Sequence, residues 1–95
     1  MNLRLDDITT FVAVAETRSV SGAARRLGIA KSVVSKRIVA LERALGATLL
    51  KRAPRSVALT DRGGAFYTRA RAILGSLDEA AAEVRELQSS LGGLV

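Results

Sequence analysis

The stretch 19–45, SVSGAARRLGIAKSVVSKRIVALERAL, decides the fold, because small and apolar residues recur in it at helical spacing on both sides of Gly28. A short helix is expected from about Ser21 to Leu27, with Ser19 or Ser21 as its N-cap. Gly28 should end this helix, because glycine readily adopts the positive φ of a tight turn.

A second helix is expected to begin near Lys31 and to end before Gly46. Two helices that cross closely need a small residue in the first and a branched apolar residue in the second, and Ala24 and Val34 meet these needs. Further inward-facing apolar residues of this unit are Ala23, Leu27, Ile29, Ile38, Leu41 and Leu45. The pattern predicts a helix-turn-helix over about residues 20–39, and the alternative is an ordinary helical corner.

Further elements are expected on both sides of this unit. A helix that begins at Leu5 and fades near Thr17 would present one apolar face, formed by Ile8, Phe11, Val12 and Ala15. After the second helix, residues 49–52 and 56–59 flank Pro54, the only proline, and read as a short basic hairpin.

The last expected element is a long helix over residues 61–91, with Thr60 as its N-cap. Its apolar residues alternate in steps of four and three, as in the seam of a coiled coil: Phe66, Ala70, Ile73, Leu77, Ala80, Val84, Leu87 and Leu91. Such a helix, about 46 Å long, needs a partner helix; the alternative is an amphipathic helix that packs on its own core. The fold class is therefore mainly α, with a winged helix-turn-helix of three helices and a two-stranded wing (about 49–59) in residues 1–60, followed by a long linker helix.

Composition excludes several functional classes. The chain has 95 residues, enough for one domain, and its lack of Cys and His excludes disulfide frameworks, thiol nucleophiles, imidazole bases and Cys/His zinc sites. Residues 1–60 carry eleven basic residues against four acidic ones, a net of +7, whereas residues 61–95 carry four against five, a net of −1. This partition indicates a polyanionic partner, and the alternative is a basic surface that serves only solubility.

The candidate DNA contacts follow from the expected geometry. In helix-turn-helix docking, the N-terminal turns of the second helix meet base edges in the major groove. The expected base-reading residues are Lys31, Ser32, Ser35 and Lys36. The residues expected at the DNA backbone or minor groove are Ser19, Ser21, Arg25, Arg37, Lys51, Arg52 and Arg55. The alternatives are a solvated helix face and, for the hairpin, a charged edge that prevents sheet aggregation.

The ordered run of motifs resembles the N-terminal winged helix-turn-helix domain of LysR-type transcriptional regulators. The resemblance covers about residues 3–65 and is carried by FVAVAE (11–16), SVSGAARRLG (19–28), SVVSKRIVALERALG (32–46), LLKR (49–52) and Leu59-Thr60. It implies a bacterial regulator that binds double-stranded DNA at an interrupted palindromic promoter site. It also implies a homodimer that forms through the seam helix. A tetramer is the alternative oligomeric state for the full-length protein.

The resemblance further implies no cofactor in residues 1–95 and a small-molecule inducer held by a C-terminal domain that lies beyond them. Residues 92–95 are expected to start the hinge to that domain. One departure concerns Ala30 and Lys31, where the family usually has Ser-Gln. Ala30 forgoes a capping hydrogen bond, and Lys31 favours guanine or phosphate over adenine.

Other functional classes remain as alternatives. A protein-interaction module would use the seam helix, but it gives no reason for placing the positive charge on the other part of the chain. A winged-helix regulator of the MarR type is the nearest competitor among DNA-binding proteins, whereas an enzyme has almost no support. No apolar run approaches the length of a membrane span and the N-terminus lacks the form of a signal peptide, so a cytoplasmic protein without membrane contact is expected.

Overall fold

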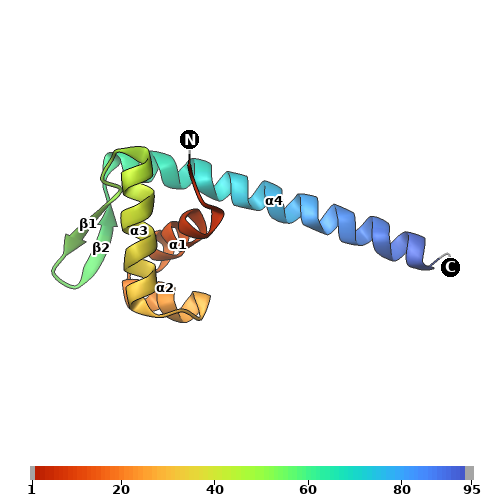
Figure 1. Ribbon diagram of the computed structural model, residues 1–95, viewed down its shortest axis with the longest axis horizontal. Coiled ribbons are helices and arrows are strands. Elements are labelled where there is room, and N and C mark those ends of the chain that lie inside the picture. The colour runs from red at the N-terminus through yellow and green to blue at the C-terminus, as the bar shows by residue number, and fades with distance from the viewer. Residues whose placement is uncertain (1, 94–95) are drawn as a thin grey trace.

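The computed structural model describes the backbone of residues 2–93 and the side chains of residues 2–88 (Figure 1). Three helices and a hairpin form a head, from which one long helix extends as a rod, and the molecule measures 57 × 27 × 19 Å. The elements are α1 (Leu5–Thr17), α2 (Val20–Leu27), α3 (Lys31–Leu45), β1 (Leu50–Ala53), β2 (Ser56–Leu59) and α4 (Asp61–Gly93). The mainly α winged helix-turn-helix with a linker helix is confirmed.

Short-range capping contacts set the ends of the helices. The Ser19 hydroxyl accepts a 2.9 Å hydrogen bond from the backbone N–H three residues on, so α2 begins at Val20, one residue earlier than expected. Gly28 and Gly46 end α2 and α3 with φ of 67° and 66°, in the left-handed region. The Thr60 hydroxyl caps α4 in the same way as Ser19 caps α2, at 3.0 Å. These predicted caps are confirmed.

The core of the head lies where α1 crosses the helix-turn-helix. Its centre is Phe11, which is fully buried and whose ring centroid lies 5.6 Å from that of Phe66 on α4. The other buried apolar residues are Val12, Ala13, Val14, Ala23, Ala24, Val34, Ile38, Leu41, Leu49 and Ala70. The apolar faces expected for the first three helices therefore pack against one another.

The wing is fastened to α3 at its base. The Glu42 carboxylate accepts hydrogen bonds from the backbone N–H groups of Leu49 (2.7 Å) and Leu50 (3.3 Å). The first strand begins at Leu50 and ends at Ala53, one residue later than expected at each end. The two strands are antiparallel, with Leu50 opposite Leu59.

The rod begins against the base of the wing. A Cβ added to Gly63 would overlap the carbonyl oxygen of Leu49 and lie only 2.9 Å from its carbonyl carbon, so glycine permits this close approach. Phe66 and Ala70 then pack on the head.

Beyond this point the predicted seam is exposed, with exposed fractions of 60% at Ile73, 47% at Leu77, 62% at Val84 and 64% at Leu87, and Ala80 is also exposed. Helix α4 continues through Gly93, two residues past the expected end and into the predicted hinge, whose residues 94–95 lie outside the described part. The side chain of Leu91 is likewise outside it. Over the described residues, no helix combines the length and the apolar character that crossing a membrane requires.

Candidate nucleic-acid interface

The predicted base-reading residues lie together on the first two turns of α3. Lys31, Ser32 and Lys36 are exposed, and Ser35 is half-buried on the side of the wing. The opposite face of the same turns carries Val34, which is fully buried. Packing against the head therefore presents a cationic and hydroxyl-bearing helix start to solvent, with α2 at its N-terminal end and the wing beside it (Figure 1).

The wing adds three cations next to this helix face. Lys51, Arg52 and Arg55 are all exposed, and Arg55 lies in the two-residue turn at the tip. The second strand is held by the head, because the Val57 N–H donates to the carbonyl of Arg18 at 3.1 Å. The wing is thus held at Val57 of its second strand and, through Glu42, at the start of its first strand.

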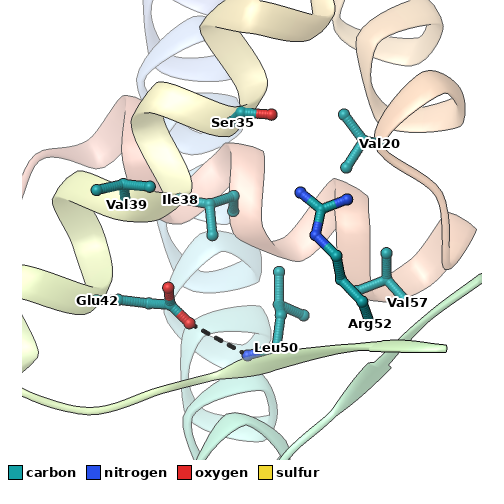
Figure 2. A pocket seen from close by; sticks show the side chains of 8 residues that line it. All are labelled: Val20, Ser35, Ile38, Val39, Glu42, Leu50, Arg52 and Val57. Atoms are coloured by element: carbon teal, nitrogen blue, oxygen red, sulfur yellow. Dashed lines mark hydrogen bonds between the residues drawn. The ribbon is translucent and has the colours of Figure 1, made fainter.

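The Arg52 side chain points from β1 toward the helix-turn-helix (Figure 2). Figure 2 shows its guanidinium group in the space between the wing, Val20 at the start of α2 and Ser35 on α3. This space is a cavity of about 140 Å³, lined by Val20, Ser35, Ile38, Val39, Glu42, Leu50, Arg52 and Val57. Arg52 therefore places its charge between the wing and the helix-turn-helix, beside the predicted base-reading residue Ser35 (Figure 2).

The remaining predicted backbone contacts have different surroundings. Arg25 is exposed on α2, Ser21 is half-buried at its start, and the Ser19 hydroxyl is engaged as the N-cap. Arg37 differs most from the expectation, because its Nη1 donates to the hydroxyl of Thr10 on α1 at 3.2 Å. Arg37 lies on the flank of α3 that meets α1, so its guanidinium stabilises the packing of the head, and its predicted contact with DNA stays a prediction.

One polar cluster was not predicted from the sequence. The carboxylate of Glu16, at the end of α1, accepts hydrogen bonds from Arg26 on α2 at 2.6 Å and from the Tyr67 hydroxyl on α4 at 2.8 Å. Arg71, one turn further along α4, donates to the same oxygen as Tyr67. We call these four residues the Glu16 cluster. No local pattern reveals it, since the partners lie 10, 51 and 55 residues from Glu16.

The Glu16 cluster perturbs the ionisation of two of its members. The hydrogen bond from Tyr67 and the two guanidinium groups lower the pKa of the Glu16 carboxyl, although partial burial acts in the opposite direction. The same hydrogen bond, together with burial, raises the pKa of the Tyr67 phenol. Glu16 is therefore a carboxylate at neutral pH, and Tyr67 is a neutral donor to it.

Residues 5–64 match the family model described as bacterial regulatory helix-turn-helix protein, lysR family. The chain is 44% identical over 92 residues to the HTH-type transcriptional regulator PtxR of Pseudomonas aeruginosa, a match that covers 97% of this chain and 30% of PtxR. The chain therefore spans about a third of the length of PtxR and of two other curated relatives that it matches.

Two solved structures of DNA complexes resemble the fold closely. The DNA-binding domain of BenM in complex with catB site 1 DNA is 36% identical with a TM-score of 0.86, covering 90% of this chain and 97% of that one. The complex of the CbnR DNA-binding domain with DNA is 34% identical with a TM-score of 0.80, covering 87% and 95% of the two chains. The similarity includes the head and a large part of the rod.

Proposed function

The chain belongs to the lysR family of bacterial regulatory helix-turn-helix proteins, and from this premise we propose that it binds double-stranded DNA as the reading and dimerising part of a transcription regulator. The observation that carries the proposal is the exposed start of α3, where Lys31, Ser32 and Lys36 face solvent beside the basic wing. A helix start of this kind fits the major groove, and the wing fits the adjacent backbone or minor groove. The DNA-bound domains of BenM and CbnR, which share this fold, support it.

Family membership decides between the alternatives raised by the sequence. It favours a LysR-type regulator over one of the MarR type and over a module that only binds proteins. The curated relatives are transcription regulators, so we assign this chain a regulatory role in the cytoplasm and no enzymatic one. Three parts of the proposal rest on the family resemblance. They are an interrupted palindromic DNA site, a tetramer as an alternative oligomeric state of the full-length protein, and a small-molecule inducer bound elsewhere in that protein.

Measurements of DNA affinity test this function. Duplexes selected from a random pool by the chain, and scrambled duplexes, would be titrated by fluorescence anisotropy. Both affinities should fall steeply from about 50 to 200 mM salt, because phosphate contacts release counterions. Lys36→Ala should reduce the ratio of specific to scrambled affinity about tenfold, whereas Arg55→Ala should weaken both affinities equally.

The matched control is Arg85→Ala, which removes the same charge from the exposed surface of the rod, far along α4. It should leave both affinities close to those of the wild-type chain. An affinity that does not change with salt would contradict the electrostatic basis of the proposal. Equal losses of specificity for Lys36→Ala and Arg55→Ala would contradict the division between reading and backbone contacts.

The rod supplies the proposed dimer interface. From Ile73 to Leu87 its exposed seam presents large apolar side chains with no cover from the head, which is the pattern of one helix of a coiled coil. Leu77→Glu should therefore convert dimers into monomers in analytical ultracentrifugation. Ala82→Glu is the control, because Ala82 is exposed on the opposite side of the seam. If Leu77→Glu sediments as the wild-type dimer does, the seam is not the interface.

A further inference from the structure

The Glu16 cluster lies at the junction of the head and the rod. Apolar contacts already hold the first turns of α4 there, since Ala70 is buried and Phe66 packs on Phe11. Such contacts are not directional, so they allow the helix to roll or tilt on the surface of the head. Hydrogen bonds to a charged acceptor are directional, so the cluster supplies what the apolar contacts lack.

Two features of the cluster constrain the direction of the rod. Tyr67 and Arg71 are four residues apart and therefore lie on the same face of α4, one turn from each other. Both donate to Oε2 of Glu16, while Oε1 accepts from Arg26 of α2. Two attachment points along the axis limit tilt as well as roll. Arg26 belongs to the helix-turn-helix. The Glu16 carboxylate therefore connects the rod to the DNA-reading unit.

The cluster contributes little to overall stability. The side chains of Arg26 and Arg71 are 48% and 63% exposed, and ion pairs with exposed partners are weakened by water and salt. The cluster is therefore better suited to selecting one orientation among several of similar packing energy than to holding the fold together.

A small change of orientation has a large effect at the far end of the rod. From Arg71 to Gly93 the helix is about 33 Å long, so a tilt of about 5° moves its end by about 3 Å. That displacement is close to the rise of one base pair, about 3.4 Å. In a dimer whose rods pair, the same change of angle shifts the two heads relative to each other by a distance of the same order.

We propose that Glu16 is a positioning residue that fixes the direction of α4 relative to the reading helix, through Tyr67 and Arg71, and so selects the spacing between DNA half-sites that the dimer accepts. The part of the proposal on the direction of α4 concerns this chain alone. The part on spacing rests on the proposed function, so the two parts are tested by separate measurements.

The first experiment measures the direction of the rod without DNA. The chain contains no cysteine, so Ala44→Cys on α3 and Ala82→Cys on α4 provide unique and exposed labelling sites. Spin labels at these sites report the distance between head and rod by pulsed electron paramagnetic resonance, and dilution with unlabelled chain isolates the distance within one molecule. Glu16→Gln in this background should shift or broaden the distance distribution.

Two further variants make the outcome decisive. Tyr67→Phe removes only the donating hydroxyl and keeps the ring, so it should broaden the distribution less than Glu16→Gln. Glu79→Gln makes the same chemical change at an exposed position of α4 outside the cluster, and its distribution should match that of the parent. An unchanged distribution in both Glu16→Gln and Tyr67→Phe would overturn the proposal.

The second experiment measures the choice of spacing. Duplexes selected by the wild-type chain would be rebuilt as a single half-site and as two half-sites with zero, one or two base pairs added or removed between them. The wild-type dimer should prefer one spacing by about tenfold, because other spacings require bent or twisted DNA. Glu16→Gln should keep the single-site affinity and lose most of this preference.

The outcomes separate the two parts of the proposal. If Glu16→Gln keeps the wild-type preference for one spacing, the link between Glu16 and DNA spacing is wrong. If the wild-type chain itself binds selected and scrambled duplexes equally, the proposed function is wrong, and the spin-label distances still decide whether Glu16 directs the rod.

Discussion

The head buries most of its apolar residues, whereas the free part of the rod exposes its large apolar residues. Leu41, on α3, is 1% exposed, whereas Leu87, on α4, is 64% exposed. Both belong to stripes with the spacing of one helix face, and nothing in the local sequence distinguishes them. Periodicity thus indicates which face of a helix is apolar, but the surface that covers that face depends on the rest of the chain or on a partner.

The boundary between the two regions falls within α4 and not at its start. Phe66, Ala70 and Leu74 pack against the core of the head, and the uncovered seam begins at Ile73. Packing on the chain's own core therefore accounts for the apolar residues in the first turns of α4. The apolar residues of the following turns remain uncovered. Ala70, at 1% exposure, has no surface left for a partner helix.

The comparison is tested most strongly by truncating one leucine in each region. Leu41→Ala should lower the free energy of unfolding by about 2–5 kcal/mol, because it leaves a cavity in a closed core. Leu87→Ala should change it by no more than about 0.5 kcal/mol at concentrations where the chain is monomeric. Urea denaturation followed by circular dichroism would measure both values.

Protein concentration provides the control for this pair. The loss caused by Leu87→Ala should grow with concentration if the seam forms a dimer, because association stabilises only the folded state. The loss caused by Leu41→Ala should stay the same. A large loss for Leu87→Ala in dilute solution would mean that the distal rod is packed within its own chain, and the contrast between the two regions would disappear.

Adjacent glycines at the start of the rod give the next largest effect. Gly63→Ala should destabilise the chain by about 1–3 kcal/mol, because the new methyl group overlaps the backbone of Leu49 at the base of the wing. Gly64→Ala is the matched control, since nothing lies within 4 Å of the added Cβ. It should stabilise α4 by about 0.5–1 kcal/mol. Thermal unfolding of both variants would show whether the rod starts in close contact with the head, and equal effects would contradict that contact.

Local features of this fold were predictable because their causes lie within a few residues. The caps at Ser19 and Thr60 and the left-handed glycines at Gly28 and Gly46 are confirmed, since each depends on neighbours three or four residues away. The buried face of α3 was equally readable from its spacing.

The contacts between elements could not be predicted in the same way. The Thr10 hydroxyl accepts from a guanidinium 27 residues away, and Glu16 meets Tyr67 across 51 residues. In the sequence these are ordinary polar residues of amphipathic helices. Their roles arise only when α1, α3 and α4 are packed, so a single sequence contains the residues of the Glu16 cluster without the information that joins them.

The smallest expected effect concerns the contact that joins the two regions. Glu16 has a lowered pKa in the folded chain, so its contribution to stability is present above about pH 4.5 and is lost as the pH falls through the lowered value. Tyr67 has a raised pKa, so its contribution is present below about pH 10 and is lost as the pH rises through the raised value. Each contribution should be about 1 kcal/mol or less, because the arginine partners are exposed.

Tyr67 makes this last prediction measurable, because it is the only tyrosine of a chain that has no tryptophan. Ultraviolet absorbance therefore follows one phenol, which should ionise above pH 10.0 in the wild-type chain and at lower pH in Glu16→Gln. Glu79→Gln should leave the titration unchanged. If Glu16→Gln titrates as the wild-type chain does, Tyr67 does not donate to Glu16 in solution. In that case the apolar packing of Phe66 and Ala70 and the Arg71–Glu16 ion pair would join the rod to the head without the Tyr67 hydroxyl.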